Sequence, residues 1–571
     1  MALDASTLSA LAYELNNALS GGRLDKVYQM SKSEALLTVR SLGTNYKLLL
    51  SCDASKGRVC LTEQTYENPD KPPVFCMLMR KHLSGGKILN IETIKNERIV
   101  KIEVENTNEL FELTKRILYI EIMGKHSNII LTDENNRILD SIRHIDFTIS
   151  EKRQVLPGFY YEYPPAQDKF DPTVMPLTEI SEILSKSPKN VEQTLVENFL
   201  GISPILAREI EASNGSKAEI LLDYLDKSTK HEYNPVILLD KSKNNLPKFL
   251  YIFDLAQYGD FYEKKYFDTV NECVDTFYRT QETKRRIDEK KEALDKVISS
   301  HVSRITKKID IHNKNIKKAE KKDKYRVYAE LITTNLYRLK ENAQEVILEN
   351  YYDENREMAI PMDETMSPSR NAKKYFEKYN KEKNMEKMSA KLIDELMVEL
   401  SYLNSVKDLL DISDDPKIVA EIREELIENK YISEPQTKKK KIQQSVSKPL
   451  EFTSSDGFLI LCGRNNRQND ELTLKIAHKN DTWLHIRDIP GCHTIIRCDG
   501  NPVPDVTLHE AALIAAHYSK DKNNTKASVD YTNVRYVKKP SGSKPGMVIY
   551  DNFKTVIVEP NTEKVESLRK V

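Results

Sequence analysis

Two apolar seams on a long, highly charged stretch without glycine constrain this chain more than any other feature. Within each seam, isoleucine, leucine or valine recurs every three, four or seven residues, which is the spacing of a helix that buries one narrow stripe. The seams comprise positions 287, 294, 298, 302, 305, 309 and 316, and positions 392, 396, 400, 403, 406 and 410. Because each seam needs a partner to cover it, they predict an antiparallel coiled-coil hairpin over 275–435, with a middle domain between its arms.

The rest of the chain mixes strands and helices, and 571 residues are too many for a single core. Runs such as ALLTVR, YKLLLSC and IVKIEVEN predict strands in 1–170, whereas 171–274 contains mainly short helical patterns. Strands and one helix are expected in 452–571, after a basic linker over 436–451 that contains Lys438 to Lys441. We therefore predict a multidomain α+β protein whose domains cover 1–170, 171–274, 275–435 and 452–571.

The composition excludes several classes of protein. Lys+Arg and Asp+Glu both number 87, so the formal net charge is +0 and any site for a polyanion must be local. The seven cysteines include no CxxC pair, which argues against a disulfide framework or a zinc knuckle and favours reduced thiols in the cytoplasm. The amino terminus lacks a basic n-region and no apolar run is long enough to span a membrane, so we expect no signal peptide and no membrane partner.

Common catalytic and metal-binding motifs are absent. The chain has no phosphate loop of the GxxxxGK type, no GxGxxG turn, no HExxH and no GxSxG elbow. His509 and Glu510 are adjacent, but their helix lacks the second histidine that a metal site needs. We therefore predict no metal, no cofactor and no catalytic residue.

A first feature suited to polyanions lies in LVENFLGISPILAREI, where two helical runs are joined by a tight turn. Gly201 lets the backbone approach a phosphate, and the helix that begins at Pro204 directs free N–H groups towards it. This is the pattern of a helix-hairpin-helix, with Gly201 and Ser203 as candidate phosphate-binding residues. The alternative is a plain helical hairpin that Ser203 caps.

A second feature is the first arm of the predicted hairpin, which is basic although the chain as a whole is neutral. Between Lys284 and Arg326 there are sixteen Lys/Arg against seven Asp/Glu. The arm either is a solvated face or lies along nucleic-acid phosphates. The candidate contacts on its polar face are Lys307, Lys308, Lys317 and Lys318.

A third feature is the density of polar donors in the last domain. One turn carries Arg464, Asn465, Asn466 and Arg467 in succession, and these side chains could bind RNA. Three rings lie close by in the sequence and could stack on bases; they belong to Trp483, His485 and His493. Core packing is the alternative for the tryptophan.

The chain resembles the NFACT family in four segments, which follow the family's order over essentially the whole length. Similarity to the NFACT-R domain lies in SSDGFLILCGRNNRQNDELTLKIA and DTWLHIRDIPGCHTII, and similarity to the coiled-coil hairpin lies in SPSRNAKKYFEKYNKEK. Similarity to the NFACT-N domain lies in EIMGKHSNIILTD and ILDSIRHID, and FLGISPILAREI resembles the family's helix-hairpin-helix. The bacterial members, once labelled fibronectin-binding proteins, are the most similar.

This resemblance implies a ribosome-associated quality-control factor. Such a factor binds a large ribosomal subunit obstructed by peptidyl-tRNA, contacts rRNA and recruits alanyl-tRNA. It drives untemplated addition of alanines to the stalled chain, as a mark for degradation. The ribosome's own peptidyl transferase centre joins the alanines, so the factor is not an enzyme. A small S4-type RNA-binding protein is a further implied partner.

The resemblance also implies tRNA-binding residues in the amino-terminal domain. The family's acidic-arginine pair falls on Glu97 and Arg98, and its second motif falls on Glu121, Ile122 and Met123. Glutamate replaces the usual aspartate, which keeps the charge but moves the carboxylate one methylene farther out.

The turn that follows the triplet raises a further question, because a hairpin needs only Gly124. Lys125 and His126 are candidate donors to tRNA phosphate or sugar. Ser127 and Asn128 either donate to RNA as well or merely close the turn through its backbone.

The family's amino-terminal fold is similar to that of formamidopyrimidine DNA glycosylases, which use an amino-terminal proline and an adjacent glutamate for chemistry. This chain begins Met1-Ala2-Leu3, so a nucleic-acid-processing enzyme is the weaker alternative. A fibronectin-binding surface adhesin is the other alternative. It needs an export signal or a wall anchor, and the sequence shows neither.

Overall fold

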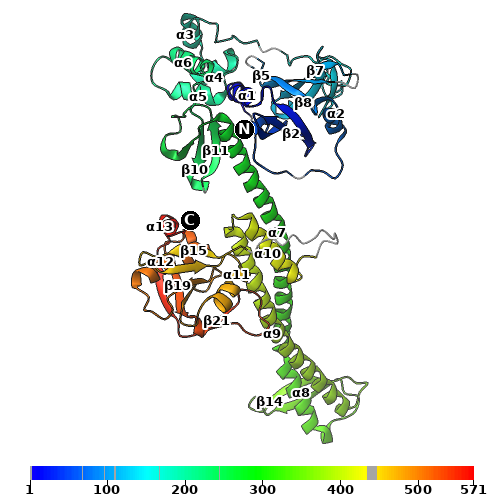
Figure 1. Ribbon diagram of the computed structural model, residues 1–571. Helices are drawn as coiled ribbons and strands as arrows, with labels where there is room; N and C mark the ends of the chain where they lie inside the picture. The colour runs from blue at the N-terminus through cyan, green and yellow to red at the C-terminus, as the bar shows by residue number, and fades with distance from the viewer. Residues whose placement is uncertain are drawn as a thin grey trace. The chain divides into compact units, whose positions relative to one another are not determined.

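The computed structural model describes residues 3–570, except 67, 95–96, 108–110, 166–167, 244 and 434–446. The chain divides into two compact units, Met1–Lys284 and Arg285–Val571, which are described separately (Figure 1). Most of the predicted basic linker, 436–451, lies outside the described residues. Within the part of the chain that the structure describes, no helix combines the length and the apolarity needed to cross a membrane.

A nine-stranded antiparallel sheet forms the first half of unit 1, in the order β4-β3-β2-β1-β5-β6-β7-β8-β9. Helix α1 (Ala5–Leu19) buries Leu8, Leu11 and Leu15, and Asp4 caps its first turn by accepting from the Thr7 N–H at 2.8 Å. Helix α2 (Val74–Leu83) also contributes to this core. The strands are β1 Arg23–Gln29, β2 Glu34–Ser41, β3 Thr44–Ser51, β4 Arg58–Leu61, β5 Lys87–Thr93, β6 Ile99–Thr107, β7 Leu113–Glu121, β8 Asn128–Asp133 and β9 Ile138–Ser141.

Four helices and a small sheet complete unit 1. The sheet has the order β11-β10-β12, and all of its pairs are antiparallel. Apolar residues from 1–170 and from 171–274 join one hydrophobic core, so these two predicted domains pack as one unit. The elements are α3 Leu177–Lys186, α4 Val191–Asn198, α5 Pro204–Ala212, α6 Lys217–Thr229, β10 Val236–Asp240, β11 Leu246–Tyr251 and β12 Tyr262–Tyr266.

The first turns of α7 (Val270–Ala319) are fixed to unit 1 by a buried ion pair. Arg58 on β4 is 2% exposed, and its Nη2 lies 3.0 Å from Glu282 Oε1. The same guanidinium stacks over the Tyr278 ring, 4.8 Å from its centroid. Because Glu282 is also buried, both charges are compensated within the core.

Unit 2 contains the predicted pair of long helices, formed by the rest of α7 and by α9 (Pro368–Ile412). Positions 287, 294, 298 and 305 of the first seam are buried and pack with positions 403, 406 and 410 of the second. Lys291 Nζ donates to the Asp411 carbonyl at 2.8 Å, whereas His312 Nδ1 lies 3.3 Å from Ser389 Oγ. The partner positions fall as the α7 positions rise, so the two helices run antiparallel. Between them lie α8 Lys322–Thr334, β13 Glu345–Asn350 and β14 Arg356–Pro361.

A six-stranded antiparallel sheet dominates the rest of unit 2, in the order β15-β16-β18-β17-β19-β22. Helix α12 (Asp505–His517) packs on this sheet through alanines and Ile514. The other elements are α10 Pro416–Glu428, β15 Leu450–Thr453, β16 Leu459–Cys462, α11 Asn466–Glu471, β17 Thr482–Ile486, β18 Thr494–Ile496, β19 Ala527–Asn533, β20 Val537–Lys538, β21 Ile549–Tyr550, β22 Lys554–Val558 and α13 Thr562–Ser567.

Candidate nucleic-acid interface

The triplet at the end of β7 is mostly buried. Glu121 is 0% exposed, and its two carboxylate oxygens accept from the Arg153 guanidinium at 2.5 and 3.0 Å. The Tyr161 hydroxyl donates to the same carboxylate at 2.9 Å. Ile122 is also 0% exposed and belongs to the core of unit 1. Neither side chain reaches the surface in this structure, and binding of tRNA by these two residues stays a prediction.

Glu121 instead positions a neighbouring segment. Arg153 and Tyr161, which it binds, bracket the chain that leads to Pro164 and Pro165. The Tyr161 ring stacks on Tyr119, with centroids 3.9 Å apart. The two prolines line a cavity of unit 1, so the buried carboxylate is bonded to the segment that leads to that cavity's wall.

The turn itself separates into closing residues and exposed residues. Ser127 Oγ accepts from the Met123 N–H at 2.8 Å. Asn128 Nδ2 donates to the Arg143 carbonyl at 2.9 Å, and Asn128 Oδ1 accepts from the Arg143 N–H at 3.1 Å. Both side chains are buried and bonded within the turn, which agrees with the alternative in which they close it. Lys125 and His126 are exposed on the short 3-10 turn Gly124–His126.

Glu97 and Arg98 precede β6 and are tied to the triplet through the backbone. The Ile122 N–H donates to the Arg98 carbonyl at 2.8 Å, which places the two motifs side by side. Burial raises the pKa of the Glu97 carboxyl, and the adjacent guanidinium opposes that shift. No described residue forms a hydrogen bond or ion pair with the half-buried Arg98 guanidinium, so it can bind a ligand.

A cavity of about 670 Å³ in unit 1 brings these residues together with the predicted helix-hairpin-helix. Glu97, Arg98 and Met123 line one part of its wall, and the turn from Gly201 to Pro204 lines another. The sequence predicted these two sets separately, about a hundred residues apart, and the fold joins them at one site. The volume lies within the range of roughly 300–1,000 Å³ that is usual for ligand sites.

The turn between α4 and α5 has the geometry that its sequence predicts. Gly201 has a φ of +73°, which favours glycine, and Pro204 begins α5. Ser203 Oγ caps that helix by accepting from the Leu206 N–H at 3.4 Å. The capping role is therefore observed, and phosphate binding by this turn stays a prediction.

Further polar residues line the cavity, and sequence reasoning missed them. They include Asp4, Lys169, Arg208 and Tyr251, which come from four separate parts of unit 1. Each residue is ordinary in its local sequence: Asp4 is a helix cap, and Tyr251 ends a strand. No local pattern marks them, because only the folded chain brings them around one space.

In the last domain, the predicted turn with many donors forms the start of α11 and binds α10 of the same unit. Arg464 Nη1 lies 2.8 Å from Asp415 Oδ2, Asn465 Nδ2 lies 2.6 Å from Glu421 Oε2, and Asn466 Nδ2 lies 3.3 Å from Glu425 Oε1. Arg467 forms an ion pair with Glu428. All four acidic partners lie on or next to α10.

This arrangement corrects a prediction. Asn465 and Asn466 are 1% and 3% exposed, and both arginines are held by α10, so the turn is not a free RNA-binding surface. The acidic residues of α10 complement these donors in charge, and they are the sequence signal that could have predicted this contact.

Two protein-family models together match almost the whole chain. The model described as the NFACT N-terminal and middle domains matches residues 4–445, and that of the NFACT protein RNA binding domain matches residues 448–552. The chain belongs to the NFACT family. The predicted resemblance is thereby confirmed.

Individual relatives place the chain within the NFACT family. It is 37% identical over 578 residues to the Rqc2 homolog RqcH of Bacillus subtilis (strain 168), with 100% of both chains covered. It is 25% identical to the human ribosome quality control complex subunit NEMF, over 38% of this chain and 19% of NEMF. A solved amino-terminal part of the fibronectin/fibrinogen-binding protein from Streptococcus suis is 30% identical, covering 48% of this chain and 99% of its own, with a TM-score of 0.43.

The aromatic side chains of the NFACT RNA binding domain are largely internal. Trp483 and His493 are 0% and 1% exposed, so the prediction that they stack on bases is wrong, and the core alternative holds for the tryptophan. His485 is half-buried and stacks on Trp483 at 5.6 Å. Burial lowers the pKa of His485 to about 4, so at neutral pH the ring is not a cation for phosphate.

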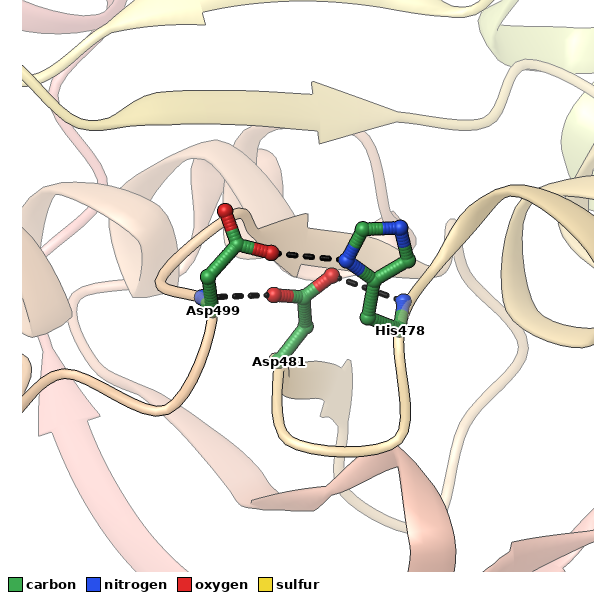
Figure 2. A group of neighbouring side chains, drawn as sticks. All are labelled: His478, Asp481 and Asp499. Atoms are coloured by element: carbon green, nitrogen blue, oxygen red, sulfur yellow. Dashed lines mark hydrogen bonds and ion pairs between the residues drawn. The ribbon is translucent and has the colours of Figure 1, made fainter.

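Three side chains near this core meet in a group that resembles a metal site, namely His478, Asp481 and Asp499 (Figure 2). Asp481 is fully buried and already accepts from the backbone N–H groups of His478, Cys498 and Asp499, at 2.8 to 3.1 Å. Its Oδ2 also lies 2.9 Å from Arg497 Nε. The Arg497 guanidinium and three backbone N–H groups already bind the Asp481 carboxylate. The group is therefore explained as a structural link that fixes two loops.

The basic arm of the NFACT hairpin keeps its exposed charges. Lys307, Lys308, Lys317 and Lys318 are all exposed on α7, beside the buried seam. No described residue forms an ion pair or hydrogen bond with their side chains. Binding of RNA by these lysines stays a prediction.

The contact between α10 and the RNA binding domain is expected to depend on pH. Burial raises the pKa of Glu425 to about 7, despite the Tyr402 hydroxyl that donates to it at 2.8 Å. A raised folded-state pKa means that the contact is most stable below about pH 4.5 and weakens as the pH rises through about 7. Glu425→Gln keeps an acceptor for Tyr402 and removes the ionisation, so it should raise stability at pH 8 by about 3 kcal/mol.

The measurement is urea unfolding between pH 5 and pH 8, followed by Trp483 fluorescence. Trp483 is the only tryptophan of the chain and lies in unit 2, so its signal reports this unit alone. The wild-type and Glu425→Gln curves should approach each other as the pH falls towards about 4.5. Parallel curves over the whole range would contradict the raised pKa.

Proposed function

We propose that this chain is a ribosome-associated quality-control factor. It binds large ribosomal subunits obstructed by peptidyl-tRNA and recruits alanyl-tRNA for untemplated alanine tailing, which marks stalled chains for degradation. The observation that carries the proposal is the cavity of unit 1, whose wall unites Glu97 and Arg98 with the turn at Gly201 and Ser203. The full-length similarity to RqcH and the partial similarity to NEMF support the same role.

The cavity suits binding and placement. Arg98 offers a guanidinium without a described partner, which can form charge-assisted bonds to a phosphate or a base edge. Lys125 and His126 are exposed on the turn that follows the triplet and add donors for tRNA. In this proposal the ribosome forms the peptide bonds in the cytoplasm, and the chain positions tRNA while α7 contacts rRNA, alone or with an S4-type partner protein.

Two alternatives have less support. The fibronectin-binding name belongs to the Streptococcus suis protein, and no feature of the cavity favours that ligand. A nucleic-acid-processing enzyme of glycosylase-like fold is the other alternative. Fibronectin binding and base excision by the purified protein would favour these alternatives.

Sedimentation tests the ribosome contact. The protein should migrate with free large subunits and not with intact ribosomes, and binding should weaken steeply with salt because phosphate contacts dominate. Changing Lys307, Lys308, Lys317 and Lys318 to glutamate should release it from the subunit. It should also lower the slope of log K against log salt by about 3–4, if each lysine meets one phosphate.

The control reverses four ion-paired lysines on or beside helices of unit 1, namely Lys186, Lys189, Lys227 and Lys230, and should leave sedimentation unchanged. An equal loss in both variants would indicate a nonspecific charge effect. Unchanged sedimentation of the α7 variant would indicate that the basic arm is only a solvated face.

A further inference from the structure

The RNA binding domain of unit 2 docks on the helical hairpin through groups of opposite charge. Its docking face consists of basic and amide side chains, namely Arg464, Asn465, Arg467, Lys520 and Lys544. The hairpin presents an acidic face on α9 and α10, which comprises Asp408, Asp415, Glu421, Glu424 and Glu428. Between Asp408 and Glu428 the sequence has eight acidic residues and two basic residues, so this face is strongly negative.

The contacts extend along the whole of α10 and onto α9. Lys520 Nζ lies 2.5 Å from Asp408 Oδ1, and the Asp408 side chain is 2% exposed. Lys544 Nζ donates to Asn429 Oδ1 at 3.1 Å and lies over the Tyr402 ring, 5.6 Å from its centroid. Together with the pairs at the start of α11, these contacts hold the basic groups of the domain on the acidic face.

This contact is packed less completely than the core of a domain. The hydrophobic cores of the RNA binding domain and of the hairpin are separate, and of the described residues in 448–570 Met547 alone joins the hairpin core. Two clefts of about 400 and 280 Å³ lie at the contact, and residues from both sides line them. Because polar pairs hold most of the contact, it can open at a small cost in free energy.

The docking face has the chemistry of a surface for RNA. A guanidinium can bind a phosphate through two parallel hydrogen bonds, and an asparagine amide can donate to sugars and base edges. Arg464 binds Asp415 and the Lys448 carbonyl through its two Nη groups, and its Nε is buried without a hydrogen-bond partner among the described residues. The five residues of the docking face all lie within 448–552, the RNA binding domain of the NFACT family. The carboxylates of the acidic face therefore occupy positions that suit phosphates.

We infer that the docking face is an RNA-binding surface of this domain, and that the acidic face of α9 and α10 occupies it as an internal competitor of RNA. RNA can displace the acidic face because phosphates then pair with the basic groups, while the released carboxylates return to water. The docked state lowers the affinity for short RNA, and RNA held nearby at a high local concentration opens it. This regulation rests on the proposed function, in which the ribosome supplies RNA beside the bound protein.

Neutralising the acidic face tests the competition. Glu421→Gln, Glu424→Gln and Glu428→Gln together remove three charges and keep the volume of each side chain. The affinity of the full chain for a labelled oligouridylate should rise by about threefold to a hundredfold, if each pair stabilises the docked state as an exposed ion pair does. Adding Arg464→Ala and Arg467→Ala to this variant should abolish the gain, because the released arginines make the new phosphate contacts.

The matched control removes the same charges elsewhere in unit 2. Glu345, Glu349 and Glu357 are exposed on β13 and β14, and their change to glutamine should leave the affinity for oligouridylate unchanged. An equal rise in both triple variants would indicate a nonspecific effect of net charge and overturn the inference. An unchanged affinity of the α10 variant would also overturn it, as would a gain that persists after both arginines are removed.

Hydrogen exchange of the wild-type chain tests the displacement without any substitution. Saturating oligouridylate should speed amide exchange in α10, which loses its partner, and should not speed exchange in α11, which binds RNA instead. Unchanged or slower exchange in α10 would mean that RNA binds elsewhere or binds the docked state, and either result would overturn the inference. These outcomes refute the internal competition alone, whereas a wild-type chain that neither copurifies with tRNA nor sediments with large subunits would refute the proposed function.

Discussion

Replacing Glu97 and Arg98 together by alanine is expected to abolish copurifying tRNA and alanine tailing while the protein still sediments with large ribosomal subunits. Arg98 lines the cavity, and its guanidinium has no described partner. One bidentate, charge-assisted contact is worth roughly 1–3 kcal/mol, or about fivefold to more than a hundredfold in occupancy. The exposed lysines of α7 lie in the other unit, so subunit binding should persist.

A neighbouring ion pair supplies the control. Lys101 and Glu103 on β6 lie 2.6 Å apart and do not line the cavity, so their double alanine variant removes the same types of charge from the same strand region. This control should retain tRNA. RNA sequencing after purification measures the copurifying tRNA, and circular dichroism establishes that each variant is folded. A folded Glu97→Ala, Arg98→Ala variant that keeps its tRNA would refute this site.

Removing either partner of the Glu121–Arg153 pair should cost unit 1 about 3–5 kcal/mol, because a charge is left unpaired in or near the core. Glu121→Ala also leaves the Tyr161 hydroxyl without its acceptor. Urea unfolding followed by far-ultraviolet circular dichroism measures the loss. Trp483 fluorescence should show that unit 2 is unaffected, since the only tryptophan lies there.

The same pair tests how the family's second motif acts. Methionine at both positions fills similar volume without burying charge, so Glu121→Met with Arg153→Met should recover the lost stability. If Glu121 only positions the segment that reaches Pro164, Glu121→Ala and Arg153→Ala should each lose tRNA binding. The double methionine variant should then bind tRNA again. If Arg153→Ala keeps tRNA and Glu121→Ala loses it, then Glu121 contacts the RNA itself.

The sequence by itself determined the features that depend on neighbours along the chain. Apolar spacing was sufficient for the two long helices, because a seam of this period must be covered by a second helix. Gly201 and Pro204 predicted a tight turn before a helix, since both residues restrict the backbone locally. The family motifs in four ordered segments were sufficient to identify the NFACT family.

Only the tertiary structure decided which polar groups remain free. Arg464, Asn465 and Trp483 have side chains that suit RNA, yet α10 occupies the first two and the core encloses the third. Conversely, Asp4 and Tyr251 have no unusual local context and meet only when α1 and β11 line the same cavity. A polar side chain is satisfied equally well by protein or by ligand, and which of these it meets depends on the path of the whole chain and not on its sequence neighbours.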